Sequence, residues 1–130
     1  MAEFVMKELV KKAGRENEFY IESRATHTDE IWNGEGSPIY PPAREMLLTK
    51  GIPFDENKRA ALLKKSDLDK FDLFIGMDSE NMRWIPRILG SSDKIQKLLE
   101  RDVYDPWYSR NFEKAYDDIL KGCTELLNRI

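Results

Sequence analysis

The apolar run Leu73-Phe74-Ile75 constrains the fold of this 130-residue chain more than any other stretch. It lies within residues 72–77, and a continuous apolar run of this length is typical of a strand buried on both faces of a parallel sheet. Ser79 follows as a candidate helix cap, and we expect a helix from there to Leu89, ended by Gly90. A buried strand followed directly by a helix indicates an α/β fold.

Apolar residues at helical spacing predict a helix over residues 1–13 and a long amphipathic helix at the C-terminal end of the chain. We predict a shorter helix over residues 42–50 and short strands over residues 19–26 and 94–99. The inner face of the C-terminal helix comprises Phe112, Ala115, Tyr116, Ile119, Cys123, Leu126 and Ile130. Helices that alternate with strands predict a parallel sheet with helices on both faces.

Three loops leave the predicted strands, at residues 28–42, after Asp78, and at residues 103–108. The first is rich in Gly and Pro, and we expect it to lack regular structure. Ligands of parallel α/β sheets bind beyond the carboxyl ends of the strands, so the three loops would face one crevice. In the third loop, Asp105 precedes Pro106 and two aromatic residues. Such an acid suits protonation of an aryl leaving group, although an ordinary Asx turn is the alternative.

The composition argues against several classes of function. Lys and Arg number 21 against 24 Asp and Glu, for a formal net charge of −3, which does not favour a nucleic-acid partner. No apolar run is long enough for a membrane span. Cys123 and His27 are the only residues of their types, so we expect no metal site, no cofactor and no Ser-His nucleophile pair. One cysteine, and no stretch that resembles a signal peptide, favour the cytoplasm.

Several segments, taken in order, resemble the low-molecular-weight protein tyrosine phosphatases of the bacterial type. The segments are Met1-Ala2-Glu3, Glu22-Ser23-Arg24-Ala25-Thr26, Pro38-Ile39-Tyr40-Pro41-Pro42-Ala43, residues 70–78, Ser79-Glu80-Asn81-Met82 and Asp105-Pro106-Trp107-Tyr108. The last resembles the general-acid loop of that family. The resemblance implies a three-layer α/β/α fold with a parallel sheet of strand order 2-1-3-4, and one phosphatase-like domain over residues 1–130.

The resemblance also implies a departure from the family. The family's nucleophilic cysteine and phosphate-binding arginine, in a Cys-x5-Arg-Ser-Pro loop, fall before the position of Met1, as does the first, central strand. We therefore expect a domain truncated at its N-terminal end and inactive as it stands. Cys123, on the apolar face of the last helix, is interpreted as a packing residue. Two sheet edges, at residues 19–26 and 72–77, would face each other and pair directly or form a homo-oligomer.

The resemblance assigns roles to six residues. Asp105 would be the general acid, Trp107, Tyr108 and Trp32 would contact the substrate, and Ser23 and Asp78 would support the phosphate loop. The alternatives are packing for Trp107 and Tyr108, an ordinary surface-loop position for Trp32, and cap or turn roles for Ser23 and Asp78. The implied activity is hydrolysis of phosphotyrosine through a cysteinyl-phosphate intermediate, once the missing N-terminal part is restored. A non-catalytic binding or self-associating module is the alternative, and a thiol-coupled arsenate reductase would need further cysteines.

Overall fold

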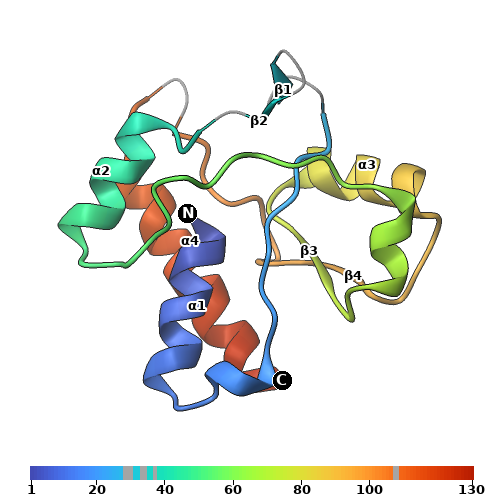
Figure 1. Cartoon of the computed structure of the whole chain (residues 1–130), viewed down its shortest axis with the longest axis horizontal. Coiled ribbons are helices and arrows are strands. Elements are labelled where there is room, and N and C mark those ends of the chain that lie inside the picture. Colours follow the sequence, from blue (N-terminus) through green and yellow to red (C-terminus); the bar gives the residue numbers. More distant parts are fainter. Residues whose placement is uncertain (28–30, 33–34, 37, 107–108) are drawn as a thin grey trace.

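The computed structural model describes residues 1–27, 31–32, 35–36, 38–106 and 109–130 of the chain (Figure 1). Its helices are α1 (Ala2–Lys12), α2 (Pro41–Thr49), α3 (Ser79–Leu89) and α4 (Phe112–Arg129), with short 3-10 helices η1 (Glu16–Glu18) and η3 (Lys65–Asp69). Its strands are β1 (Ile31–Trp32), β2 (Glu35–Gly36), β3 (Phe74–Gly76) and β4 (Ile95–Lys97). The predicted helices at both ends of the chain and the helix after residue 78 are confirmed within a few residues.

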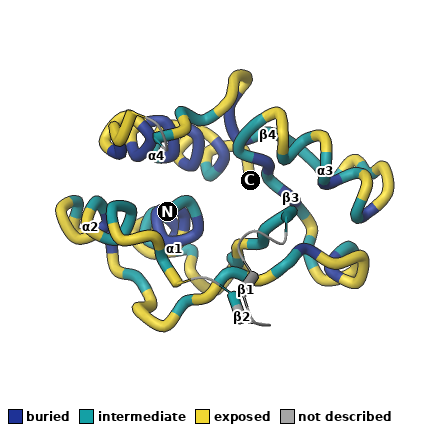
Figure 2. Tube along the Cα trace, turned by 90° about the horizontal axis from the view of Figure 1, so that it is seen from above, coloured by how far each residue is buried: buried dark blue, intermediate teal, exposed yellow. Residues whose placement is uncertain are grey.

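Strands β3 and β4 form a parallel pair, with Phe74 opposite Ile95. Successive side chains of a strand point to opposite faces of the sheet. Phe74 packs in a cluster with Leu89 of α3, whereas Ile75 packs against the cluster built by α1 and α4. Figure 2 shows α3 on one side of β3 and the α1–α4 pair on the other. The prediction of a parallel strand covered on both faces, and with it the α/β fold, is confirmed.

The larger apolar core lies between α1 and α4, with α2 packed against it. Val5 and Val10 of α1 and Leu47 of α2 are almost fully buried. On α4, a Cβ added to Gly122 would lie 2.4 Å from Cγ of Leu98, the residue that follows β4. The absence of a side chain at Gly122 therefore lets the chain after β4 pack closely on α4.

Residues 19–26 do not form the strand that their sequence predicts. The segment is extended, yet it has a single bridge, in which Ala25 pairs with Leu62. The Ala25 N–H donates to Ala61 O over 2.7 Å, and the Leu63 N–H donates to Ala25 O over 2.8 Å. A strand needs a neighbour that continues the ladder over successive residues, and the chain at residues 61–63 supplies one rung. Within the described part of the chain, the segment does not pair with β3 either.

The loop at residues 28–42 also differs from its prediction, because it contains a short antiparallel pair. Ile31 lies opposite Gly36, and Trp32 lies opposite Glu35. Gly36 lies so close to Ala60 that an added Cβ would be 1.7 Å from the Ala60 carbonyl oxygen. The close approach of the two backbones explains the need for glycine here. Among the described residues, no helix has the length and apolar character required to span a lipid bilayer.

Candidate active site

Asp105 is exposed and lies in the loop that connects β4 with α4. The backbone holds this loop against the end of β3, because the Val103 N–H donates to Met77 O over 2.9 Å. Met77 is the first residue after β3, so Asp105 lies close in sequence to a contact with the carboxyl end of that strand. Two of the three predicted crevice loops, those after β3 and β4, therefore do meet at this edge of the sheet.

Asp78 caps helix α3. Its carboxylate accepts a hydrogen bond of 2.8 Å from the backbone N–H of Asn81, in the usual arrangement of an N-cap residue. The Asn81 side-chain oxygen in turn accepts 2.9 Å from the backbone N–H of Met77. The end of β3 and the start of α3 are thus joined through two side chains. Asp78 therefore has the cap role, and its role beside a phosphate loop stays a prediction.

Asp102 ties the start of α3 to the Asp105 loop, although nothing in the sequence analysis singled it out. One Asp102 carboxylate oxygen accepts from the Ser79 backbone N–H over 3.0 Å and from the Ser79 hydroxyl over 2.8 Å. Lys97 at the end of β4 donates to the same oxygen. Hydrogen bonds from Lys97 and then Ser79 lower the pKa of Asp102. The loop that carries Asp105 is therefore connected to both β4 and α3.

Ser23 belongs to a different cluster, at the first turn of α1. Its hydroxyl donates over 2.8 Å to Glu3, a buried residue. Glu3 also accepts 2.7 Å from Lys7 and forms an ion pair of 3.0 Å with Lys58. Burial by itself raises the pKa of Glu3, but hydrogen bonds from Lys7, Ser23 and Lys58 outweigh it and leave the pKa below its usual value. Lys58 reaches Glu22 as well, over 2.9 Å.

Glu3 was not singled out by the sequence analysis, but its position carries a signal. It precedes the buried Met6 by three residues and Val10 by seven, so it falls on the apolar face of α1. A carboxylate on such a face requires partners. Lys7, Lys58 and Ser23 supply them and thereby fasten residues 22–23 and 58 to α1.

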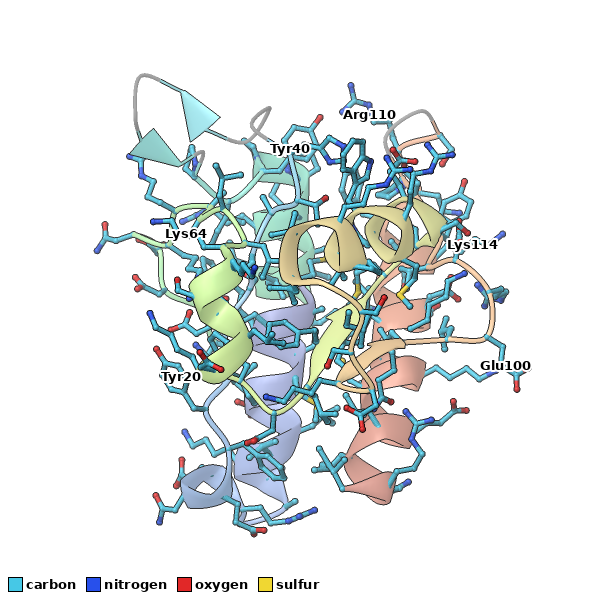
Figure 3. All side chains as sticks on the ribbon, turned by 90° about the vertical axis from the view of Figure 1, so that its right-hand side faces the viewer. Tyr20, Tyr40, Lys64, Glu100, Arg110 and Lys114 are labelled. Carbon is cyan, nitrogen blue, oxygen red and sulfur yellow. The ribbon has the colours of Figure 1, made fainter. Side chains whose placement is uncertain are left out.

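The predicted aromatic wall is described in part. Trp32 lies in β1, and Trp107 and Tyr108 lie outside the described residues. Arg110, further along the β4–α4 loop, is in the left-handed region at φ 62°. The Arg110 N–H donates to Pro106 O over 2.7 Å, and its guanidinium donates to the Tyr40 hydroxyl. Figure 3 shows Arg110 and Tyr40 at the same end of the molecule.

Cys123 lies inside the α1–α4 core with 2 % of its surface exposed. Burial raises the pKa of its thiol to about 11. Since the thiolate is the nucleophile in cysteine chemistry, a thiol that stays protonated at neutral pH is poorly suited to attack phosphorus. The interpretation of Cys123 as a packing residue is confirmed. Across the described ranges, no three His, Cys, Asp or Glu side chains gather in a way that would hold a metal ion.

Comparison with known proteins agrees with this arrangement. The family profile described as low molecular weight phosphotyrosine protein phosphatase matches residues 1–130. The chain is 33% identical to the low molecular weight protein-tyrosine-phosphatase YfkJ of Bacillus subtilis, an alignment that covers 100% of this chain and 86% of the relative. It is 31% identical to PtpA of Staphylococcus aureus, over 100% of this chain and 84% of that relative.

Solved structures give the same relationship. The crystal structure of SP-PTP, a low molecular weight protein tyrosine phosphatase from Streptococcus pyogenes, superposes with a TM-score of 0.88 at 36% identity. That superposition covers 99% of this chain and 82% of the other. The crystal structure of YfkJ from Bacillus subtilis superposes with a TM-score of 0.89 at 33% identity, and covers 99% of this chain and 84% of the other.

Proposed function

Because the chain belongs to the low molecular weight phosphotyrosine protein phosphatase family, we propose that it carries the general-acid part of a phosphotyrosine phosphatase site, with Asp105 as the acid. The contact of its loop with the end of β3, through Val103 and Met77, carries this proposal. Ligands of α/β proteins bind at this edge of the sheet. An exposed carboxylic acid there is available to protonate a leaving phenolate oxygen.

The proposed reaction cleaves a phosphotyrosine ester in two steps. A thiolate attacks phosphorus while Asp105 gives its proton to the leaving tyrosine oxygen, which forms a cysteinyl phosphate. Asp105 then takes a proton from the water that attacks this intermediate, and phosphate leaves. We propose Trp32, Trp107 and Tyr108 as contacts of the substrate ring. Ser23 and Asp78 would support a phosphate loop from the first turn of α1 and the end of β3, where their hydrogen bonds lie.

We further propose that these 130 residues do not turn over phosphate esters by themselves. The chemistry requires a low-pKa thiolate at an anion-binding loop. The one cysteine of the sequence, Cys123, lies in the core of α4 and has a raised pKa instead. A single cysteine that forms no disulfide within the chain is usual in a reducing compartment, so we propose that the protein is cytoplasmic.

Assay of the purified chain with p-nitrophenyl phosphate tests this proposal. We expect no turnover above background, and the same result for Cys123→Ser. The relative YfkJ, assayed in parallel, is the positive control for the substrate and buffer. Turnover that disappears in Cys123→Ser would show that the buried thiol acts as a nucleophile, and would contradict the proposal.

A non-catalytic, self-associating module is a second candidate function. One edge of β3 pairs with β4, and no strand pairs with its other edge within the described chain. The extended residues 19–24 lie outside any ladder as well. Unpaired strand edges are templates for association with another chain. Light scattering at increasing protein concentration tests this candidate, and a compact monomer at every concentration would exclude it.

A further inference from the structure

One buried carboxylate, Asp118 of α4, holds the start of the loop that carries Asp105. Its two oxygens accept a paired set of hydrogen bonds from Arg101, of 2.8 Å from Nη1 to Oδ2 and 2.7 Å from Nη2 to Oδ1. Oδ2 also accepts 2.9 Å from the backbone N–H of Tyr104. The carboxylate therefore joins two points of the loop, three residues apart, to one position on the helix.

The burial of Asp118 makes this attachment specific. The residue is 7 % exposed, and a buried carboxylate is strongly destabilising unless charged and hydrogen-bonding partners compensate it. The planar guanidinium of Arg101 matches both oxygens, the geometry in which such pairs are strongest. Arg101, followed by the Tyr104 N–H, holds the pKa of Asp118 down at about 2, against the effect of burial. The carboxylate is therefore charged throughout the neutral range.

The backbone on the acid side of this attachment has little freedom. Val103 is bonded to Met77 at the end of β3, and Tyr104 is bonded to Asp118. The ammonium group of Lys114, also on α4, lies 4.5 Å from the centre of the Tyr104 ring. Asp105 follows directly, and its Cα lies about 3.8 Å from that of Tyr104 across a trans peptide bond. The backbone that leads into Asp105 is therefore held both by the end of β3 and by α4.

We propose that Asp118 is a positioning residue for Asp105: it sets the place of the acid by holding Arg101 and the Tyr104 N–H on α4. The inference rests on the proposed role of Asp105 as general acid. Asp118 itself is covered by the loop and acts through Tyr104. The fixed loop would keep the acid at the carboxyl end of β3, where the leaving group is proposed to lie.

Nuclear magnetic resonance of the full 130-residue chain tests the proposal. In Asp118→Asn, we expect exchange of the Tyr104 amide proton to accelerate roughly tenfold or more, as expected when a hydrogen bond to a charged group is lost. The carboxyl carbon resonance of Asp105 should change as well. Amide exchange in the rest of α4 should stay as in the wild type. The matched control is Asp117→Asn, the same chemical change at an exposed neighbour on the same helix.

Arg101→Lys is the second variant, chosen because the Arg101 side chain is 59% exposed and lysine keeps a positive charge beside the buried Asp118 while it loses the two parallel hydrogen bonds of the guanidinium. It should affect the same two residues, Tyr104 and Asp105, and it decides the matter if Asp118→Asn does not fold. Unchanged Tyr104 and Asp105 signals in the folded variants would overturn the proposal. So would faster exchange spread evenly over α4, which would indicate general stabilisation. None of these measurements depends on catalytic turnover. They therefore test the positioning of Asp105 independently of its proposed role as general acid.

Discussion

The two halves of the molecule differ in how they are held together. The helical half, α1, α2 and α4, shares one large apolar cluster that includes Val5, Leu47 and Ile119. The sheet half, β3, β4, α3 and η3, has a small cluster of four buried residues, Leu63, Phe74, Ile85 and Leu89. Buried apolar area is the main source of stability. The helical half can therefore keep its structure with little help, whereas the sheet half depends on its attachment to the helices.

Two kinds of contact make that attachment. Leu98, after β4, packs into the helical cluster against Gly122 of α4. The extended segment at residues 19–26 runs between the halves in Figure 1, and ion pairs of Lys58 with Glu3 and Glu22 hold it. The proposed acid loop crosses from one half to the other and is bonded to both. The site of the proposed chemistry thus lies at the contact between the helical half and the sheet half.

The largest effect is expected when the two halves are joined by a further strand. We would extend the chain before Met1 with about five apolar residues and a Cys-x5-Arg-Ser-Pro loop from a relative. The loop would supply a thiolate at the N-terminus of α1, so turnover of p-nitrophenyl phosphate should appear, whereas we expect none from the unextended chain. The strand would bury apolar area between the halves, and the free energy of unfolding should rise together with activity.

Within that extended chain, Asp105→Asn should lower the turnover of phenyl phosphate about a hundredfold or more, the usual effect of losing a general acid. The loss should be smaller for p-nitrophenyl phosphate, because nitrophenolate leaves readily without a proton. Asp117→Asn, at an exposed position of α4, is a control for the charge change. Equal rates for Asp105→Asn and the parent on both substrates would show that Asp105 is a turn residue.

The next largest effect is expected from two matched cavity-forming substitutions, which should show that the two halves differ in stability. Leu47→Ala in α2 and Leu89→Ala in α3 each remove a fully buried leucine, a change that costs about 2–5 kcal/mol. Leu47→Ala should lower the denaturation midpoint of the whole chain. Leu89→Ala should accelerate amide exchange in α3, β3 and β4 while α1 and α4 keep their protection. If amide exchange rises equally in both halves for both variants, the chain unfolds as one unit and the two halves do not differ in how they are stabilised.

The sequence predicts the helices and the β3 strand well because their signals are local. Apolar residues at helical spacing define α1 and α4 whatever surrounds them, and the apolar run at residues 73–75 requires burial on both faces. Residues 19–26 have the composition of a strand, but a strand exists only where a partner continues the ladder, and a single bridge at Ala25 forms. The prediction failed there because pairing is a property of two segments.

The candidate site divides in the same way. Asp105 could be proposed from the sequence because Pro106 and two aromatic residues follow it, as in the general-acid loop of the family that it resembles. Asp118 was missed, although it follows the buried Ala115 by three residues and precedes Gly122 by four, and so falls on the apolar face of α4. A charged residue on such a face indicates a partner that is charged or donates hydrogen bonds. The partner is Arg101. That Arg101 meets Asp118 depends on how the β4–α4 loop folds back onto α4, and the spacing of residues along α4 does not predict this.

A smaller effect is expected from overpacking the contact between the halves. In Gly122→Ala, the new Cβ would lie 2.4 Å from Cγ and 2.8 Å from Cδ2 of Leu98, too close for either to stay in place. Overpacking of this kind costs about 1–3 kcal/mol. Chemical denaturation should report that loss, and the double variant Gly122→Ala with Leu98→Ala should remove the clash. A Gly122→Ala chain as stable as the parent would show that Leu98 moves without cost and does not join the halves.

The smallest expected effect is a change in the acid dependence of stability, because it concerns one ion pair at the joint. Arg101 lowers the folded pKa of Asp118 to about 2, below the usual value of about 3.9 for an unfolded aspartate. A carboxylate with a depressed folded pKa adds stability that is fully present above the unfolded pKa and is lost as the pH falls through the folded one. The difference in urea midpoint between the wild type and Asp118→Asn should therefore be constant above about pH 5 and shrink as the pH falls towards about 2. Glu3, whose pKa is also lowered, contributes in the same direction in both proteins, so the subtraction removes it. Asp117→Asn should follow the wild type throughout, and a difference for Asp118→Asn that stays constant down to the lowest pH would show that Asp118 holds the loop by hydrogen-bond geometry alone.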